Sequence, residues 1–184
     1  MYGMVHNAAR NMAVDALGND EWALLLKTYK LSPDQFISNN NYSDAVTFEI
    51  VDAISERLGV GTNDLLRAFG RYWIEYAATS PYGVMFRVGG QDIRSFLRNL
   101  NRMHASIHAT MPGSRMPSFE VLLETNSRID VLYVSERTGL EAFVEGLFSG
   151  LLHHFGENGE VAHLESRTDG DVFSILLSGP RAAA

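Results

Sequence analysis

The chain has 184 residues, of which 46% are hydrophobic and 20% charged, an ordinary globular balance that predicts one domain with a sizeable core. Its 22 acidic residues against 15 lysines and arginines give a formal charge of -7, which argues against a nucleic-acid binder, since that needs a clustered basic face. There is no cysteine, which excludes disulfides, cysteine zinc sites, iron–sulfur clusters and thiol catalysis. A cofactor must therefore be held by histidine, carboxylate, hydroxyl or backbone groups.

Membrane association is not expected from the sequence. No apolar run approaches the roughly 20 residues that span a bilayer. Residues 1–12 also lack the apolar core of a signal peptide. We therefore expect a cytoplasmic protein.

The first two-thirds of the chain have the apolar periodicity of helices. The expected helices are residues 2–17, ended by Gly18; a short helix capped by Asp20; a start at Ser32-Pro33-Asp34; a helix opened by Ser43 and ended by Gly59 and Gly61; a helix capped by Thr62, which Ser80-Pro81-Tyr82-Gly83 extends or interrupts; and a helix from about Asp92 to Ala109, stopped by Pro112-Gly113.

After Pro117 the period changes to that of strands. Residues 119–124 and 129–137 are expected to form two strands, 139–155 a helix, and 160–167 with 172–178 a closing hairpin across an Asp-Gly turn. The predicted class is α+β: a helical N-terminal lobe joined to a small antiparallel sheet that carries a long helix. Residues 181–184 are set apart as a tail.

His104 lies on the apolar stripe of the helix expected at 92–109, seven residues after Leu97. The plain interpretation is a core histidine whose nitrogens bond to backbone groups. The second is an axial metal ligand, because neutral imidazole in an apolar pocket is a common ligand of haem iron. A third is a zinc site shared with His108, although no further ligand stands nearby in the sequence.

The segment Tyr133-Val134-Ser135-Glu136-Arg137 is the second unusual pattern. Strand alternation would place Tyr133, Ser135 and Arg137 on one face. A phenol, a hydroxyl and a guanidinium in a row suit an anionic ligand with more than one carboxylate, because arginine makes bidentate charge-assisted bonds. The alternative is that this face emerges into water and the arginine pairs with nearby glutamates.

Together these patterns resemble the haem–nitric oxide/oxygen binding (H-NOX) domain, which is also the sensor module of soluble guanylate cyclase. The resemblance extends from Met1-Tyr2-Gly3 to about Ser178. Further matching segments are Tyr42-Ser43-Asp44, Ala68-Phe69-Gly70-Arg71-Tyr72-Trp73, Asn99-Leu100-Asn101-Arg102-Met103-His104 and Pro117-Ser118-Phe119-Glu120.

The resemblance implies haem b, held without a covalent link between a helical lobe of about residues 1–60 and a haem-embracing lobe of about residues 61–180. His104 matches the proximal ligand of the iron. Pro117 matches the proline that presses on the porphyrin. The remaining matches are to the triplet that binds the two propionates: Tyr133, Ser135 and Arg137.

The resemblance also indicates which gas is bound. Members that hold oxygen stably carry a distal tyrosine, and its position here is Ala142 or Phe143, neither of which can donate a hydrogen bond. The other expected distal residues are mostly apolar: Met1, Met4, Val5, Trp73 and Leu147. An apolar pocket disfavours charge-separated bound oxygen but leaves nitric oxide and carbon monoxide binding largely unaffected. The expected function is therefore a ferrous-haem nitric oxide sensor without catalytic activity.

For signalling, the expectation is that nitric oxide weakens or breaks the His104–iron bond, frees the helix that carries His104, and lets the haem relax against Pro117 so that the lobes rotate. Standalone bacterial members of this length class act on a separate histidine kinase or cyclic-di-GMP enzyme, and such a protein is the expected partner. Three alternatives stay open: a weak oxygen-binding or redox-responsive haem sensor, a zinc-dependent enzyme, and a haem-free interaction module.

Overall fold

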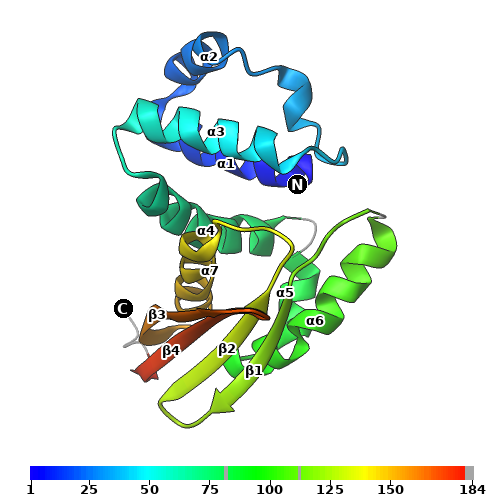
Figure 1. The fold of residues 1–184 in the computed structure, drawn as a ribbon, viewed down its shortest axis with the longest axis vertical. Helices are drawn as coiled ribbons and strands as arrows, with labels where there is room; N and C mark the ends of the chain where they lie inside the picture. The colour runs from blue at the N-terminus through cyan, green and yellow to red at the C-terminus, as the bar shows by residue number, and fades with distance from the viewer. Residues whose placement is uncertain (81–82, 112, 181–184) are drawn as a thin grey trace.

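The computed structural model describes residues 1–80, 83–111 and 113–180. Its first part is helical and consists of α1 (Gly3–Leu17), α2 (Asn19–Thr28), the short 3-10 helix η1 (Pro33–Phe36), α3 (Asp44–Leu58) and α4 (Thr62–Thr79). Its second part consists of α5 (Gly83–Gly89), α6 (Ile93–Thr110), β1 (Ser118–Glu124), β2 (Arg128–Val134), α7 (Glu141–His154), β3 (Glu157–Arg167) and β4 (Gly170–Pro180). The predicted α+β class is confirmed (Figure 1).

Several helix ends fall where the sequence predicts them. Gly18 ends α1 with a φ of 86°, and Gly59 ends α3 in the left-handed conformation with a φ of 66°. Glycine suits both positions because a Cβ would be strained there. Ser43 precedes α3 as predicted.

Two predicted caps were wrong by one or two positions. Gly18 caps α2, so Asp20 lies inside the first turn, where its carboxylate faces the positive end of the helix dipole. Gly61 caps α4, and Thr62 is the first helical residue. The start predicted at Ser32 is a single 3-10 turn rather than a longer helix.

Some predictions fall on positions that the structure does not describe. They are the junction at Pro81-Tyr82, the helix stop at Pro112, and the tail 181–184. On either side, α4 ends at Thr79 and α5 begins at Gly83, so the described residues give two helices here.

The four strands form one antiparallel sheet in the order β1-β2-β4-β3. All four predicted strands are present. The second, β2, ends at Val134 instead of Arg137. Val134 pairs with Ser118, the first residue of β1, and Tyr133 pairs with Asp171 at the start of β4. The two neighbouring strands therefore end at this level, and Ser135 and Arg137 lie in the loop before α7.

Two apolar cores share helix α4. Its first half places Leu65, Leu66 and Phe69 in a core with α1, α2 and α3. Its second half places Ile74 and Ala77 in a core with α5, α6, α7 and the sheet. In Figure 1, α1–α3 lie above α4 and the sheet with α6 below it. A lobe boundary near residue 60 remains a proposal, because α4 takes part in both cores.

Glycines bring α4 and α7 close together where they cross. A Cβ on Gly70 would lie 2.3 Å from the Phe143 carbonyl oxygen, and one on Gly146 would lie 2.2 Å from that of Arg67. Such distances are well inside van der Waals contact, so only glycine permits this packing. The crossing sets the position of α7 against the sheet.

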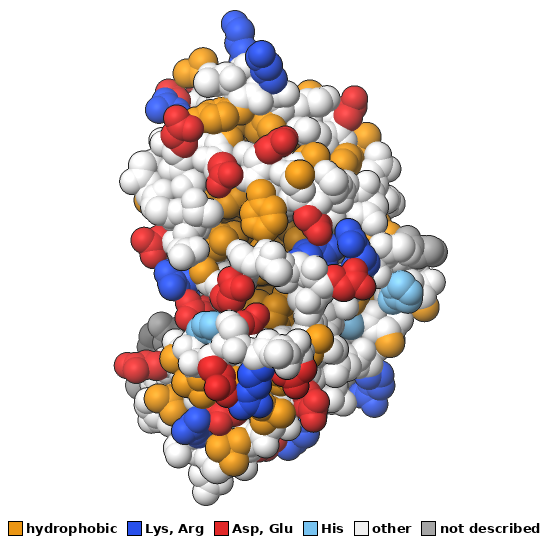
Figure 2. All heavy atoms as spheres, viewed as in Figure 1, with side chains coloured by type: hydrophobic (Ala, Val, Ile, Leu, Met, Phe, Trp, Pro, Cys, Tyr) orange, Lys and Arg blue, Asp and Glu red, His pale blue; other side chains and the backbone are white. Residues whose placement is uncertain are grey.

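Acidic and basic side chains are interleaved over the face shown in Figure 2, rather than gathered by sign. Within the ranges that the structure describes, none of the helices is long and apolar enough to cross a membrane.

Candidate functional site

Helix α6 begins at a strong cap and presents His104 to the interior. The Asp92 side chain accepts a 2.7 Å hydrogen bond from the Ser95 backbone N–H, which supplies a partner for an otherwise unpaired amide. The apolar stripe that follows is buried: Ile93, Phe96, Leu97 and Leu100. His104 continues the same stripe one turn later, as the sequence predicts.

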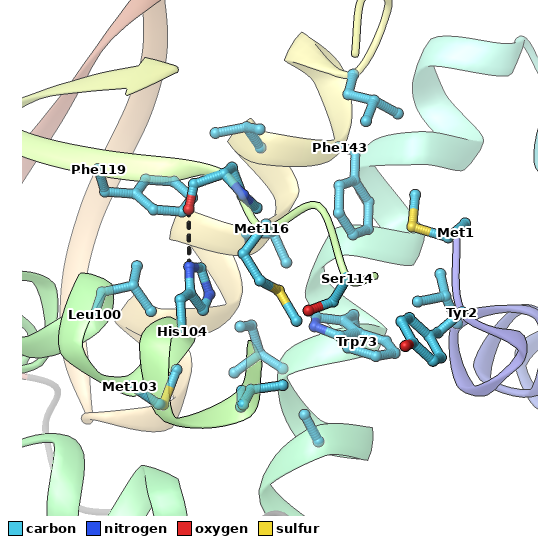
Figure 3. A pocket seen from close by; sticks show the side chains of 18 of the residues that line it. Met1, Tyr2, Trp73, Leu100, Met103, His104, Ser114, Met116, Phe119 and Phe143 are labelled. Carbon is cyan, nitrogen blue, oxygen red and sulfur yellow. Dashed lines mark hydrogen bonds between the residues drawn. The ribbon is translucent and has the colours of Figure 1, made fainter. Parts of the chain in front are cut away.

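The two ring nitrogens of His104 have different surroundings. Nδ1 lies 2.9 Å from the carbonyl oxygen of Pro117, so it carries the proton and donates (Figure 3). Nε2 is then the unprotonated nitrogen, and it has no hydrogen-bond partner among the described residues. Burial lowers the pKa of His104 and outweighs the bond to Pro117, which acts in the opposite direction. The lowered pKa favours the neutral ring. A neutral imidazole with its other nitrogen fixed by a carbonyl is the usual arrangement of a metal ligand.

His6 shows how a purely structural histidine differs. Its Nδ1 lies 2.7 Å from the Gln35 carbonyl oxygen and its Nε2 lies 2.8 Å from the Thr47 hydroxyl. Both nitrogens are thus used within the protein, and only 1% of the residue is exposed. The core-histidine interpretation describes His6, whereas His104 keeps one nitrogen for a ligand.

His104 faces an apolar cavity of about 230 Å³. Nine of the ten residues named from the sequence as cofactor or metal ligands line it: Met4, Val5, Trp73, His104, Pro117, Tyr133, Arg137, Phe143 and Leu147. They come from α1, α4, α6, α7, β2 and the adjoining loops, so sequence positions far apart meet in one place. Figure 3 shows His104 on one side and Trp73, Tyr2 and Met1 on the other.

Ser135 is the residue that does not line the cavity. Its hydroxyl accepts a 3.0 Å hydrogen bond from the Arg137 backbone N–H and also interacts with the Tyr133 phenol. Burial raises the pKa of Tyr133, against the opposing effect of that interaction, so the phenol stays protonated. The predicted single strand face was wrong, because the strand ends before Ser135. Ser135 instead holds the loop that positions Tyr133 and Arg137, through its interactions with both residues.

Arg137 is held at the cavity by two bonds that leave part of its guanidinium available. Nε donates to Asp44 Oδ1 at 2.9 Å, and Nη1 donates to the Arg115 carbonyl oxygen at 2.8 Å. Only 10% of the side chain is exposed. Burial raises the pKa of Asp44, but bonds from Arg137 and the Met1 amine outweigh this and leave the pKa below its ordinary value. An ionised Asp44 thus orients the arginine.

The wall opposite His104 is mainly apolar. Phe143 lines the cavity, whereas Ala142 packs into the N-terminal core. Of the two residues named for the distal-tyrosine position, Phe143 is therefore the one that reaches the cavity, and its side chain has no hydrogen-bond donor. This wall does include hydrogen-bond donors, among them the Trp73 indole and the Tyr2 phenol (Figure 3). Tyr2 was missed as a site residue, because its place beside Trp73 depends on how α1 packs against α4.

The zinc alternative finds little support in the geometry. His108 Nδ1 lies 2.9 Å from both the carbonyl oxygen and the hydroxyl of Ser114. Across the described ranges, no group of three or more His, Asp or Glu side chains is placed to hold a metal ion.

The donor set suits a broad apolar ligand that carries a metal and an anionic edge. His104 offers a single neutral nitrogen, the walls are apolar, and Arg137 and Tyr133 supply donors at one end. Haem has these three properties, and the residues present fit it.

Fold and cavity together define an α+β protein with a site for a metal-bearing apolar cofactor. A family model described as "Haem-NO-binding" (HNOB) matches residues 2–163, and the chain belongs to that family. Its members bind haem and gases in sensor domains related to soluble guanylate cyclase.

Relatives and solved structures agree with this assignment. The chain is 24% identical over 155 residues to soluble guanylate cyclase 89Da of Drosophila melanogaster. The aligned region covers 84% of this chain and 23% of that protein. It thus spans about a quarter of the length of the curated relatives. The fold is similar to an H-NOX protein from S. oneidensis (TM-score 0.86, 23% identity, 100% of both chains). It is also similar to an oxygen-binding H-NOX domain related to soluble guanylate cyclases (TM-score 0.80, 23% identity, 100% of this chain and 98% of that one).

Proposed function

We propose that this protein is a haem b sensor that binds nitric oxide at ferrous iron and passes the signal to a separate protein. The observation that carries the proposal is the imidazole of His104, whose Nδ1 is fixed by Pro117 while Nε2 faces the cavity. When bound, haem would supply an iron that takes up a diatomic gas.

Each part of the cavity has a role in this proposal. His104 holds the iron through Nε2. Arg137 and Tyr133 bind the propionates, and Ser135 positions both of them through its hydroxyl. Pro117 lines the cavity, where it would contact the haem, and it fixes the tautomer of His104 through its carbonyl oxygen.

Selectivity for nitric oxide, with carbon monoxide as a second ligand, follows from the opposite wall. Met4, Val5, Phe143 and Leu147 lack a hydrogen-bond donor, and bound oxygen needs one because it carries partial negative charge. Nitric oxide and carbon monoxide are far less polarised when bound, so an apolar wall admits them.

Oxygen binding or a redox response remains the second candidate, and one observation favours it. Trp73 and Tyr2 line the same wall and carry an N–H and an O–H group. Either group would stabilise bound oxygen if it reached the gas.

The route of the signal is built from α6 and the segment after it. Pro117 holds the Nδ1 side of His104, and haem would hold the Nε2 side, so loss of the Nε2 contact would leave the ring tied to Pro117 alone. That change frees α6 relative to the cavity. We propose a histidine kinase or a cyclic-di-GMP enzyme in the cytoplasm as the partner, which must bind the two states differently for the coupling to work.

Substitution of His104 tests the ligand assignment. We expect His104→Ala to lose most bound haem during purification and to recover it when imidazole is supplied. His108→Ala is the matched control, because His108 is one turn away but bonds Ser114, and it should retain haem. Full haem content in His104→Ala, measured from the absorption spectrum, contradicts the assignment.

Optical spectra distinguish the two gases. We expect the reduced protein to bind nitric oxide and to show no stable oxygen complex in air. A stable oxygen complex that disappears in Trp73→Phe or Tyr2→Phe supports the second candidate instead. A six-coordinate nitric oxide complex that keeps His104 contradicts the release of Nε2.

A further inference from the structure

The methionines of this chain are concentrated around one cavity. Six of the seven line it: Met1, Met4, Met85, Met103, Met111 and Met116. The cavity takes in only about a sixth of all residues, so an even distribution would place about one methionine there. The haem-binding role does not require this, because leucine and phenylalanine supply apolar walls equally well.

Methionine thioethers are the only sulfur atoms of the protein, since the chain has no cysteine, and six of the seven lie at this cavity. A methionine sulfur is oxidised reversibly to the sulfoxide, which turns a flexible apolar side chain into a polar one. Burial of a sulfoxide oxygen in an apolar cavity removes its hydrogen bonds to water, and this costs free energy unless a donor in the cavity replaces them. Oxidation of a lining methionine should therefore lower the affinity of the cavity for an apolar ligand.

Met116 is the most accessible of these methionines, with 37% of its surface exposed, whereas Met111 has 8%. In Figure 3 its side chain extends into the space between His104 and Trp73. It precedes Pro117, whose carbonyl oxygen holds the imidazole of His104. A single side chain thus meets solvent and reaches the centre of the site.

We propose that Met116 is a site of reversible oxidation by hydrogen peroxide or an organic hydroperoxide, and that the modification weakens ligand binding in the cavity. The sulfur attacks one peroxide oxygen, the O–O bond breaks, and the S–O bond forms. The sulfur loses two electrons, the peroxide gains them, and water or an alcohol leaves. A methionine sulfoxide reductase with a thiol reductant restores the thioether.

The experiment uses the full chain prepared without haem, because haem itself reacts with peroxide. After mild treatment with hydrogen peroxide, peptide mass mapping gives the order in which the methionines gain one oxygen atom. Binding of two probes is then titrated, haemin and the apolar fluorophore ANS. We expect Met116 to be modified first and the affinity for both probes to fall on the order of tenfold.

Two variants separate Met116 from the other methionines. Met116→Leu keeps an apolar side chain and should bind both probes equally well before and after peroxide. Met12→Leu is the matched control: Met12 packs in the N-terminal core outside the cavity, and this variant should stay as sensitive as the parent chain. Reductase treatment should restore binding in the parent chain, and an unchanged thermal melt shows that the loss is not unfolding.

The proposal is overturned if Met116 stays unmodified while other methionines react, if complete oxidation of Met116 leaves probe binding unchanged, or if Met116→Leu loses affinity to the same extent. ANS keeps the test separate from the proposed haem function. A chain that takes up no haemin contradicts that function, whereas peroxide-sensitive ANS binding still reports on Met116.

Discussion

His6 is buried between α1, α3 and the η1 segment with both ring nitrogens bonded, so a charge on its ring would be shielded from water. Burial lowers the pKa of His6 below its ordinary value of 6.5, against the opposing effect of the bond to Gln35. The folded protein therefore resists protonation at a pH where the unfolded chain accepts it. This residue links stability to pH independently of any cofactor.

The lowered pKa of His6 makes the folded protein less stable as the pH falls. As pH falls below 6.5, the unfolded chain binds more protons than the native protein, so the free energy of unfolding decreases until the folded pKa is reached. One such group contributes up to about 1.4 kcal/mol per pH unit. We expect chemical denaturation between pH 7 and 5 to show this loss, and His6→Gln to show a shallower slope. His153→Gln, which replaces a largely exposed ring, is the control for removing an imidazole as such.

The crossing of α4 and α7 depends on glycines that meet backbone atoms. Alanine usually stabilises a helix relative to glycine by about 1 kcal/mol. At Gly146 the added Cβ would instead meet the Arg67 carbonyl oxygen, and overpacking of this kind costs about 1–3 kcal/mol. We expect Gly146→Ala to lower the melting temperature by several degrees.

Ser149→Ala on the same helix is the control for this experiment. It removes a hydroxyl that bonds the Glu145 carbonyl oxygen and adds no atom at the crossing. We expect its melting temperature to equal or slightly exceed that of the parent chain. A Gly146→Ala protein as stable as the parent would show that the helices can separate at this point without cost.

Sequence patterns predicted the elements well and the site in part. The stripe through Leu97, Leu100 and His104 is local, so its period alone placed His104 toward the interior. The position of Ser135 could not be found in this way, because β2 ends where its partner strands end, and that is a property of the whole sheet. The contribution of Asp44 to the site was missed for a similar reason: its partner, Arg137, is 93 residues away.

An ion pair at the cavity edge connects the N-terminal helices to the loop before α7. Asp44 at the start of α3 bonds Arg137 in the loop before α7, and Arg115 lies 3.6 Å from the same carboxylate. Charge-assisted bonds between partly buried groups are stronger than those at the surface. We expect Asp44→Asn to reduce the free energy of unfolding by about 1–2 kcal/mol.

A double-mutant cycle with Arg137→Gln measures the pair itself. If Asp44 acts through Arg137, the effects of the two substitutions on the free energy of unfolding are less than additive. Asp64→Asn serves as the control, since its pair with Arg67 involves a carboxylate that is 78% exposed and should contribute little. Full additivity of Asp44→Asn and Arg137→Gln would mean that the pair does not join these elements energetically.

Helix α4 contributes residues to both apolar cores, so neither half of the molecule can be exchanged between proteins without the other. A recombination point within or before α4 would separate Leu65, Leu66 and Phe69 from the helices they cover, or deprive the other half of Ile74 and Ala77. In either case an apolar face would be left in water. Inheritance of this protein, or its fusion to another domain, is therefore expected to keep α1 through β4 together as one block.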